Sequence, residues 1–313
     1  MERIVRALDR FQRTHRGPAF AFAVIKKFGD DQAGALAALI AYYTFFALFP
    51  LLLVLSTVLG FALHAHPALH DRLLGSALVN FPVIGPSLKQ GTLRGSGIGL
   101  VVGFVGLLWA GIGAMRASEN AMNTVWNVPR RLRPGFFPSI GRAVLALGVL
   151  GGGLVLATAL SGVFTWSGSI GPLGRFAGLV GSIVVDTLIF LFAFHVLTRL
   201  DLAWSDLLPG SILAGMAWGL LQALGSYYIG HALKGASETY GTFGLVIVLL
   251  SWLYLQAQVA LYAAEVNVVR KRHLWPRGIL NDDLTDADVR SLEDYARTEE
   301  RLPNERVLAV ISR

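Results

Sequence analysis

The sequence predicts an all-α, polytopic membrane protein whose core is a six-transmembrane-helix bundle. Six apolar stretches lie between Gly34 and Ala264, and each is about long enough to cross a bilayer, which takes about 20 helical residues. Only 15% of the 313 residues are charged, whereas a soluble domain carries about a quarter. Lys and Arg concentrate on alternate sides of successive stretches, as in multi-pass proteins.

The distribution of charge divides the chain into three parts. Charged residues are sparse in 34–264 and gather in the first 33 and last 49 residues. We therefore expect a basic, amphipathic segment at 1–33, a membrane domain at 34–264 and a cytoplasmic tail at 265–313. No cleavable signal peptide is expected, because the first apolar run is far longer than a signal's apolar region. The predicted spans lie near 34–63, 96–115, 142–163, 178–199, 207–230 and 241–264.

The positions of Lys and Arg predict the orientation. Residues 1–33 hold seven, 116–142 five, position 199 one and 265–313 nine, against five in the segments on the opposite side. Cytoplasmic segments carry the excess of Lys and Arg, so both termini are expected inside a bacterial inner membrane. The segments expected outside are 64–95, 164–177 and 231–240.

The first span, of about 30 residues, contains Pro50. Proline removes one helical hydrogen bond and clashes with the carbonyl four residues earlier, here that of Phe46. We expect a helix kink at Pro50. The alternative is that the freed carbonyl lines a cavity.

Both polar ends carry helical patterns. Two short apolar stripes flanked by Arg and Lys predict N-terminal interfacial amphipathic helices on the anionic inner leaflet. A nucleic-acid-binding arm is the weaker interpretation, because an apolar stripe needs a surface on which to be buried. In the tail, the polar run 281–288 predicts the cap of a helix near 285–298. The stripes are Ile4, Leu8 and Phe11, then Phe20, Val24 and Phe28.

Several motifs lie at the entries and ends of predicted spans: Ala38–Pro50, Trp109–Trp126 followed by Arg130, Arg131 and Arg133, Trp204–Gly210, Tyr240–Gly244, Trp252–Tyr254 and Ala264–Asn267. Together they resemble the YihY/virulence factor BrkB family of inner-membrane proteins over about residues 20–272. The resemblance implies a six-helix, all-α fold but no settled activity. Members were once labelled ribonuclease BN, a label regarded as mistaken, and some are linked to serum resistance or proposed to handle envelope lipids.

One histidine cluster bears on the nuclease interpretation. His64, His66 and His70 with Asp71 offer metal-ligating side chains. Their spacing differs from the His-x-His-x-Asp-His of metallo-β-lactamase-type nucleases, and they are expected outside, away from cellular RNA. We therefore expect a solvated loop, with no metal, no cofactor and no ribonuclease activity.

Polar side chains inside predicted spans are costly to bury in hydrocarbon and mark candidate functional positions. By depth they form two layers, which we interpret as an intramembrane polar path or a headgroup-sized cavity. The alternative is interhelical hydrogen bonding, worth about 0.6 kcal/mol per bond. The outer layer is Asp186, Gln222 and Ser251, with Thr158 or Ser161 nearby, and the inner layer is His195, Gln256 and Gln258.

A second candidate site is a polar rim at the predicted inner face. It suits an inner gate or a phosphate-binding rim, since arginine binds phosphate through paired hydrogen bonds. Two alternatives stay open: Arg116 and Glu119 lie three residues apart and can pair, and positive-inside anchoring also explains the arginines. The rim residues are Arg116, Glu119, Asn123 and Glu265, with Arg130, Arg131 and Arg133 as the phosphate-binding arginines.

The absence of catalytic motifs favours a non-enzymatic protein. The sequence has no cysteine, no Gly-x4-Gly-Lys-Ser/Thr loop, no Gly-x-Ser-x-Gly motif and no close pair of acid/base groups with a nucleophile. Our leading hypothesis is a protein that moves or accommodates a lipid or other amphiphilic envelope component, with membrane lipids and no nucleic acid as partners. A membrane-anchored scaffold or assembly factor is the first alternative and an intramembrane enzyme the last. An oligomer remains open.

Overall fold

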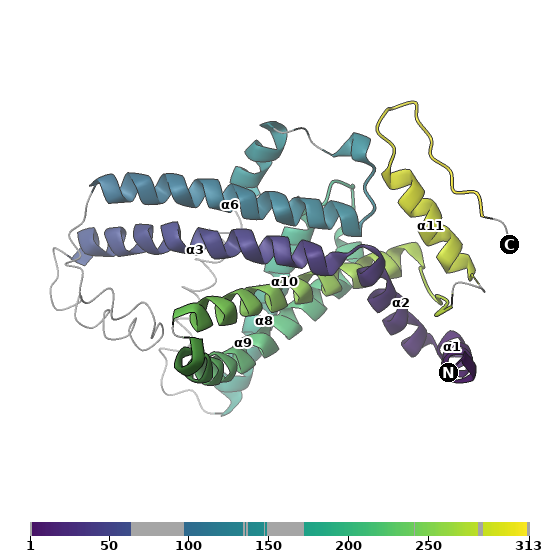
Figure 1. The fold of residues 1–313 in the computed structure, drawn as a ribbon, viewed down its shortest axis with the longest axis horizontal. Helices are drawn as coiled ribbons and strands as arrows, with labels where there is room; N and C mark the ends of the chain where they lie inside the picture. Colours follow the sequence, from purple (N-terminus) through teal and green to yellow (C-terminus); the bar gives the residue numbers. More distant parts are fainter. Residues whose placement is uncertain are drawn as a thin grey trace. The chain divides into compact units, whose positions relative to one another are not determined.

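The structure is a computed structural model that describes residues 2–63, 97–133, 135, 137–146, 148, 172–240, 242–280 and 284–311. Helices dominate these residues and no strand occurs among them, as the all-α prediction requires (Figure 1). Residues 137–146 are also helical. The named elements are α1 (Glu2–Thr14), α2 (Arg16–Asp30), α3 (Ala33–Leu63), α6 (Gly97–Val125), η1 (Arg130–Leu132), α8 (Pro172–Leu197), α9 (Trp204–Tyr240), α10 (Thr242–Arg272) and α11 (Asp286–Thr298).

The chain divides into two compact units. The smaller is Tyr42–Ala114, and the larger combines Met1–Ala41 with Met115–Arg313. In the smaller unit α3 and α6 run side by side (Figure 1). A Cβ on Gly106 would lie 3.2 Å from the ring of Pro50, and one on Gly113 would lie 2.6 Å from the ring of Tyr43. Glycines in α6 therefore let the two helices approach closely. Helix α3 continues through Pro50 to Leu63, and Pro50 packs against its neighbour.

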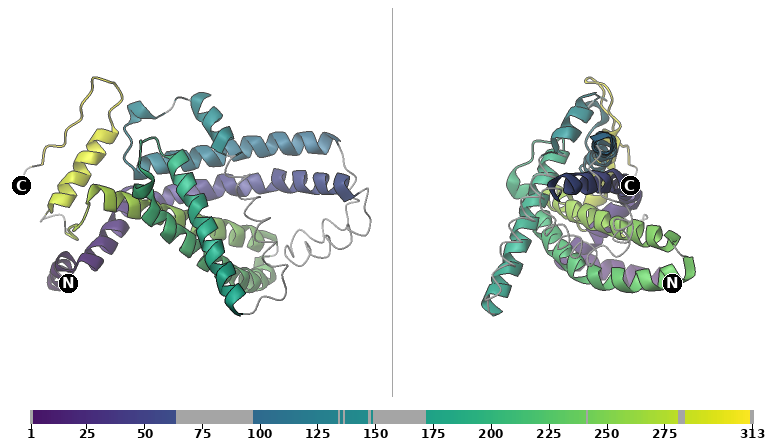
Figure 2. Two further views of the ribbon diagram at one scale, coloured as in Figure 1. Left: turned by 180° about the vertical axis from the view of Figure 1, so that it is seen from behind. Right: turned by 90° about the vertical axis from the view of Figure 1, so that its left-hand side faces the viewer.

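In the larger unit α9 packs against both α8 and α10, and α10 packs against α2 (Figure 2). Two side-chain hydrogen bonds join α9 to α10. The Asn267 side chain accepts a hydrogen bond from Gly210 N at 2.7 Å and donates one to the Leu207 carbonyl at 3.0 Å. Two stretches of the family resemblance therefore meet, Trp204–Gly210 and Ala264–Asn267, and these residues hold helices together.

Four of the described helices are long and apolar enough to cross a bilayer: Ala33–Val54, Gly97–Val125, Gly178–Leu197 and Val246–Arg272. They coincide with the first, second, fourth and sixth predicted spans. The fifth predicted span lies within α9, which is not one of the four. Most of the third, 142–163, lies outside the described residues, as does the histidine cluster at 64–71. The count of six spans thus stays a prediction.

The two N-terminal helices form where the apolar stripes predict them, but they are buried differently. Val24 and Phe28 of α2 belong to the protein core and Phe20 packs against it, so this stripe lies on protein where lipid was expected. Among the α1 residues whose burial the structure describes, Asp9 and Gln12 are the buried ones. Its apolar residues at positions 8 and 11 are 56% and 55% exposed. Contact of these helices with lipid stays a prediction.

The tail packs against other helices within the larger unit. Helix α11 begins at a capping box in which Thr285 and Asp288 satisfy each other's backbone N–H groups. Asp288 also accepts hydrogen bonds from Lys26 at 3.0 Å and from Arg277 at 2.8 Å. The expected helix near 285–298 is thus confirmed, and these bonds fix its first turn against α2.

Candidate functional site

The best candidate site is a group of charged side chains at the end of α6 and of α8, which we call the Glu119 cluster. It comprises Glu119 of α6, Ser139 and Arg142 of the 137–146 helix, and Arg199 just after α8. Three separate segments thus each contribute a side chain. All four residues belong to the larger unit.

One carboxylate faces two guanidinium groups in this cluster. Nε of Arg142 lies 3.7 Å and Nε of Arg199 3.6 Å from the same oxygen, Oε1 of Glu119. Both distances exceed those of hydrogen bonds, and this oxygen has no hydrogen-bond partner among the described residues. The other oxygen accepts a bond from Ser139 Oγ at 3.2 Å. The cluster therefore has an excess positive charge and guanidinium donors that the carboxylate does not use.

Neighbouring backbone and amide groups fix the positions of these arginines. Arg142 Nη2 donates to the Val196 carbonyl at 2.7 Å, which ties the 137–146 helix to the end of α8. Asn123, which is buried, accepts a bond from the backbone N–H of Arg199 at 3.2 Å. Arg133 donates to the Asn123 carbonyl at 3.3 Å. Asn123 thus couples α6 to the segment after η1 and to the segment after α8.

A cavity of about 350 Å³ adjoins the cluster and is lined by Arg142, Leu145, His195 and Val196. The His195 ring stacks on Trp204 with the centroids 4.2 Å apart. Its Nδ1 is buried and has no hydrogen-bond partner in the part of the chain that the structure describes. The cavity thus combines a cationic end at Arg142 with aliphatic walls formed by Leu145 and Val196. This combination suits a ligand with an anionic group attached to an apolar body.

Of the predicted inner layer, His195 lies in this cavity, whereas Gln258 donates to the Tyr254 hydroxyl at 3.0 Å within α10. In the outer layer Asp186 is half-buried, and Gln222 and Ser251 are exposed. No described contact joins these three side chains. The polar path through the helices therefore stays a prediction. The predicted inner-layer residue Gln256 is half-buried.

The predicted rim residues occupy different environments. Glu119 and Asn123 belong to or support the Glu119 cluster, while Glu265 is buried in α10, 3.8 Å from Nζ of Lys27. Arg130 and Arg131 pair with carboxylates of the tail, Glu299 and Glu300, each at 3.1 Å. Arg133 donates to the Asn120 side chain at 3.2 Å, and Arg116 is half-buried.

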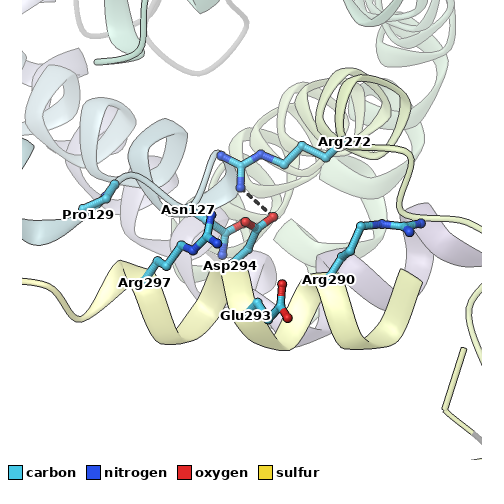
Figure 3. A pocket seen from close by; sticks show the side chains of 7 residues that line it. All are labelled: Asn127, Pro129, Arg272, Arg290, Glu293, Asp294 and Arg297. Carbon is cyan, nitrogen blue, oxygen red and sulfur yellow. Dashed lines mark ion pairs between the residues drawn. The ribbon is translucent and has the colours of Figure 1, made fainter. Parts of the chain in front are cut away.

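A second cavity, of about 480 Å³, lies beside α11, and most of the residues that line it are charged (Figure 3). Arg272 reaches from the end of α10 toward α11, where Nη1 lies 2.7 Å from Oδ2 of Asp294. Arg290 donates to the His273 carbonyl at 2.7 Å. The cavity lacks the aliphatic wall found beside the Glu119 cluster. Its lining residues are Asn127, Pro129, Arg272, Arg290, Glu293, Asp294 and Arg297.

Comparison with known proteins agrees with the motifs. A sequence model of the family described as Virulence factor BrkB matches residues 24–279. A UPF0761 membrane protein of Stenotrophomonas maltophilia (strain K279a) is 26% identical over 277 residues, which cover 83% of this chain and 62% of that protein. The chain thus spans about three-fifths of that relative's length. No solved structure matches the chain.

Two shorter relatives are covered more fully. Inner membrane protein YhjD of Escherichia coli (strain K12) is 25% identical over 280 residues, 81% of this chain and 82% of that protein. The ribonuclease-like protein YfkH of Bacillus subtilis (strain 168) is 25% identical over 258 residues, 77% of this chain and 91% of that protein. Since the family model covers more than half of the sequence and four helices are able to span a bilayer, the chain is an integral membrane protein of the virulence factor BrkB family.

Proposed function

We propose that this protein binds an amphiphile with an anionic headgroup, a lipid or lipid-linked envelope precursor, and moves or accommodates it in the membrane. The observation that carries the proposal is the Glu119 cluster beside its cavity. Arg142 and Arg199 share one carboxylate without hydrogen-bonding to it. A phosphate or carboxylate headgroup would take up these donors, and its acyl portion would lie along Leu145 and Val196.

The arrangement favours an anion over a cation or a neutral ligand. Glu119 balances only one of the two guanidinium charges, and Arg133 adds a further positive charge nearby through its bonds to Asn120 and Asn123. Hydrogen bonds to a charged partner are worth about 1.5–3 kcal/mol each. The loss of one such bond should therefore weaken binding about tenfold to a hundredfold.

Native mass spectrometry with lipid analysis tests the proposal on protein extracted gently from the membrane. We expect one anionic lipid class to be enriched above its abundance in the membrane. Anionic phosphatidylglycerol is compared with zwitterionic phosphatidylcholine as the reference. Arg142→Gln or Arg199→Gln should reduce that enrichment. Glu119→Gln should increase it, because it removes the negative charge that faces both guanidinium groups. Arg130→Gln is the matched control, since Arg130 pairs with Glu299 in the tail and should leave enrichment unchanged.

Bound lipid that mirrors the bulk membrane in all variants would refute the proposal. A Glu119→Gln variant that lost lipid as the arginine variants do would show that the cluster is structural. The predicted intramembrane polar path can be tested by a further variant. If Asp186 lies on the route of the amphiphile, Asp186→Ala should lower transport while leaving binding at the Glu119 cluster intact.

A membrane-anchored scaffold is the second candidate function, and the polar cavity beside α11 favours it. Its exposed side chains Glu293 and Arg297 suit a polar partner protein better than a lipid. Glu293→Ala with Arg297→Ala would leave the docked helix in place. If function in cells then fails while lipid enrichment is normal, the scaffold proposal is favoured over the lipid proposal.

We also propose a location in the inner membrane with both termini cytoplasmic, and action without catalysis. The excess of Lys and Arg in the terminal segments supports the orientation. Reporter fusions at each terminus would test it. Incubation of the purified protein with RNA and with phospholipids, followed by product analysis, would test for hydrolysis of either.

A further inference from the structure

A group of ionisable side chains joins α2, α10 and α11, separately from the Glu119 cluster, and its charged members Lys27, Asp31 and Glu265 are fully buried. Lys27, at the end of α2, has no exposed side-chain surface. Its Nζ donates to Asp31 Oδ2 at 2.5 Å and to the Val125 carbonyl at 3.0 Å. The Tyr295 hydroxyl of α11 donates to the other Asp31 oxygen at 2.6 Å. Asp31 thus receives a bond on each oxygen.

Glu265 of α10 completes this group and differs from Asp31. Its side chain is also fully buried, and its Oε2 lies 3.8 Å from Lys27 Nζ. Neither of its oxygens has a hydrogen-bond partner among the described residues. The Lys27 ammonium thus has two carboxyl groups beside it, that of Asp31 at 2.5 Å and that of Glu265 at 3.8 Å. A carboxyl group with both oxygens unsatisfied is costly in a protein interior unless it carries a proton that it can donate.

The net charge of the buried group also favours a protonated Glu265. Lys27 supplies one positive charge, and Asp31 takes up its hydrogen bond. If Glu265 were ionised as well, the buried group would hold a net negative charge with no exposed atom to hydrate it. Two close carboxyl groups that share one cation ordinarily share one proton.

We propose that Glu265, beside Lys27 and Asp31, holds a single exchangeable proton, and that this proton keeps α2, α10 and α11 packed together at this site. Tyr295 and Asp30 are the other titratable groups that face the site. Burial and the Asp31 carboxylate raise the pKa of Tyr295, so it stays a neutral donor. Asp30 pairs with Arg277 at 3.0 Å. The Lys27 ammonium already occupies the position of a cation, which favours a proton over a metal ion as the ligand.

Loss of the proton would affect α11 first. Helix α11 reaches the buried group through the hydroxyl of Tyr295, whereas α2 contributes two charged residues and is continuous with α3 through a short turn. An extra negative charge would be relieved most readily if α11 moved away and admitted water. The proposal is independent of lipid binding at the Glu119 cluster, since it concerns other residues and another ligand.

Infrared difference spectroscopy of the purified full chain tests the bound proton directly. At neutral pH wild type should show the carbonyl stretch of a protonated carboxyl group, shifted in deuterated buffer, and Glu265→Gln should lose it. Glutamine resembles the protonated acid in shape and charge, so this variant should fold. The matched control is Glu119→Gln, which removes another buried carboxylate that faces two arginines and should leave the band unchanged. A band that persists in both Glu265→Gln and Asp31→Asn would overturn the assignment.

Hydrogen exchange tests the second half of the proposal. After correction for intrinsic exchange rates, protection of α11 amides in wild type should fall at high pH, while Glu265→Gln should keep its protection. Equal pH dependence in the two proteins would show that the proton does not hold α11. Since neither measurement uses lipid, failure here would leave the lipid proposal intact, and failure of lipid binding would leave this proposal intact.

Discussion

Replacement of Gly210 by alanine should separate α9 from α10. A Cβ at this position would lie 2.1 Å from the Ala263 carbonyl oxygen and 2.5 Å from Nδ2 of Asn267. The Ala263 carbonyl oxygen is a backbone atom, so it cannot move away by a change of side-chain rotamer. Nδ2 of Asn267 belongs to an amide held by two hydrogen bonds, one from Gly210 itself. The added methyl group must therefore push the two helices apart.

The magnitude follows from two contributions. Insertion of a methyl group into a well-packed contact costs about 1–3 kcal/mol. Separation of the helices also weakens both Asn267 hydrogen bonds, each worth about 0.5–1.5 kcal/mol. Together they give a loss of about 2–6 kcal/mol, which is a large part of the about 5–15 kcal/mol that stabilises a typical protein.

Gly219→Ala provides the control in the same helix. There the nearest atom to a new Cβ is Ile183 Cγ1 at 3.9 Å, an ordinary contact. Alanine favours the helix over glycine by about 1 kcal/mol, so this variant should be as stable as wild type or slightly more stable. Denaturant unfolding of both variants in the same detergent, followed by tryptophan fluorescence, would measure the difference. If Gly210→Ala were no less stable than Gly219→Ala, the close approach of α9 and α10 would be refuted.

Three further predictions concern the tail. Burial opposes ionisation of Asp288, but hydrogen bonds from Arg277, Gly278 N, Thr285 and Lys26 outweigh it and hold its pKa well below the usual range. This group therefore stabilises the docked tail above about pH 4, the pKa of an unfolded Asp, and its contribution is lost as pH falls further. In wild type, the protection of α11 amides from hydrogen exchange should fall below about pH 4. Unchanged protection down to pH 2 would contradict this. Thr285→Ala should destabilise α11 by about 0.5–2 kcal/mol through loss of the cap, measured by the same exchange, whereas Thr285→Ser should restore it. Tyr295→Phe should cost about 1–3 kcal/mol by leaving one Asp31 oxygen unpaired, which thermal unfolding would detect, and a transition equal to that of wild type would argue against the Tyr295–Asp31 bond.

The sequence predicts the helices of this protein better than it predicts which of them meet. Apolar length alone locates α3, α6, α8 and α10, because a span needs about 20 apolar residues whatever its neighbours. The cap at Thr285 is equally local, since its pattern lies within four residues. These elements require no knowledge of the tertiary fold.

Pairings between distant segments are a different matter. Arg142 and Arg199 entered the sequence analysis only as positive charges near the inner face, because nothing local reveals that both face Glu119. The basic residues beside the second apolar stripe were expected at a lipid surface, yet one of them, Lys27, is fully buried. Its spacing of four residues from Asp31 is a local signal that could have suggested an ion pair. Burial of that pair depends on α10 and α11, which come more than two hundred residues later.

The docked tail affects the order in which the protein becomes complete during synthesis. Lys27 and Asp31 are translated early, but Glu265 and Tyr295, which lie beside them in the fold, are translated more than two hundred residues later. Until then a lysine and an aspartate destined for the interior remain exposed to water. A chain that stops before position 295 would keep this site open. Proteases that recognise loosely packed segments would then distinguish such a chain from one that includes Tyr295.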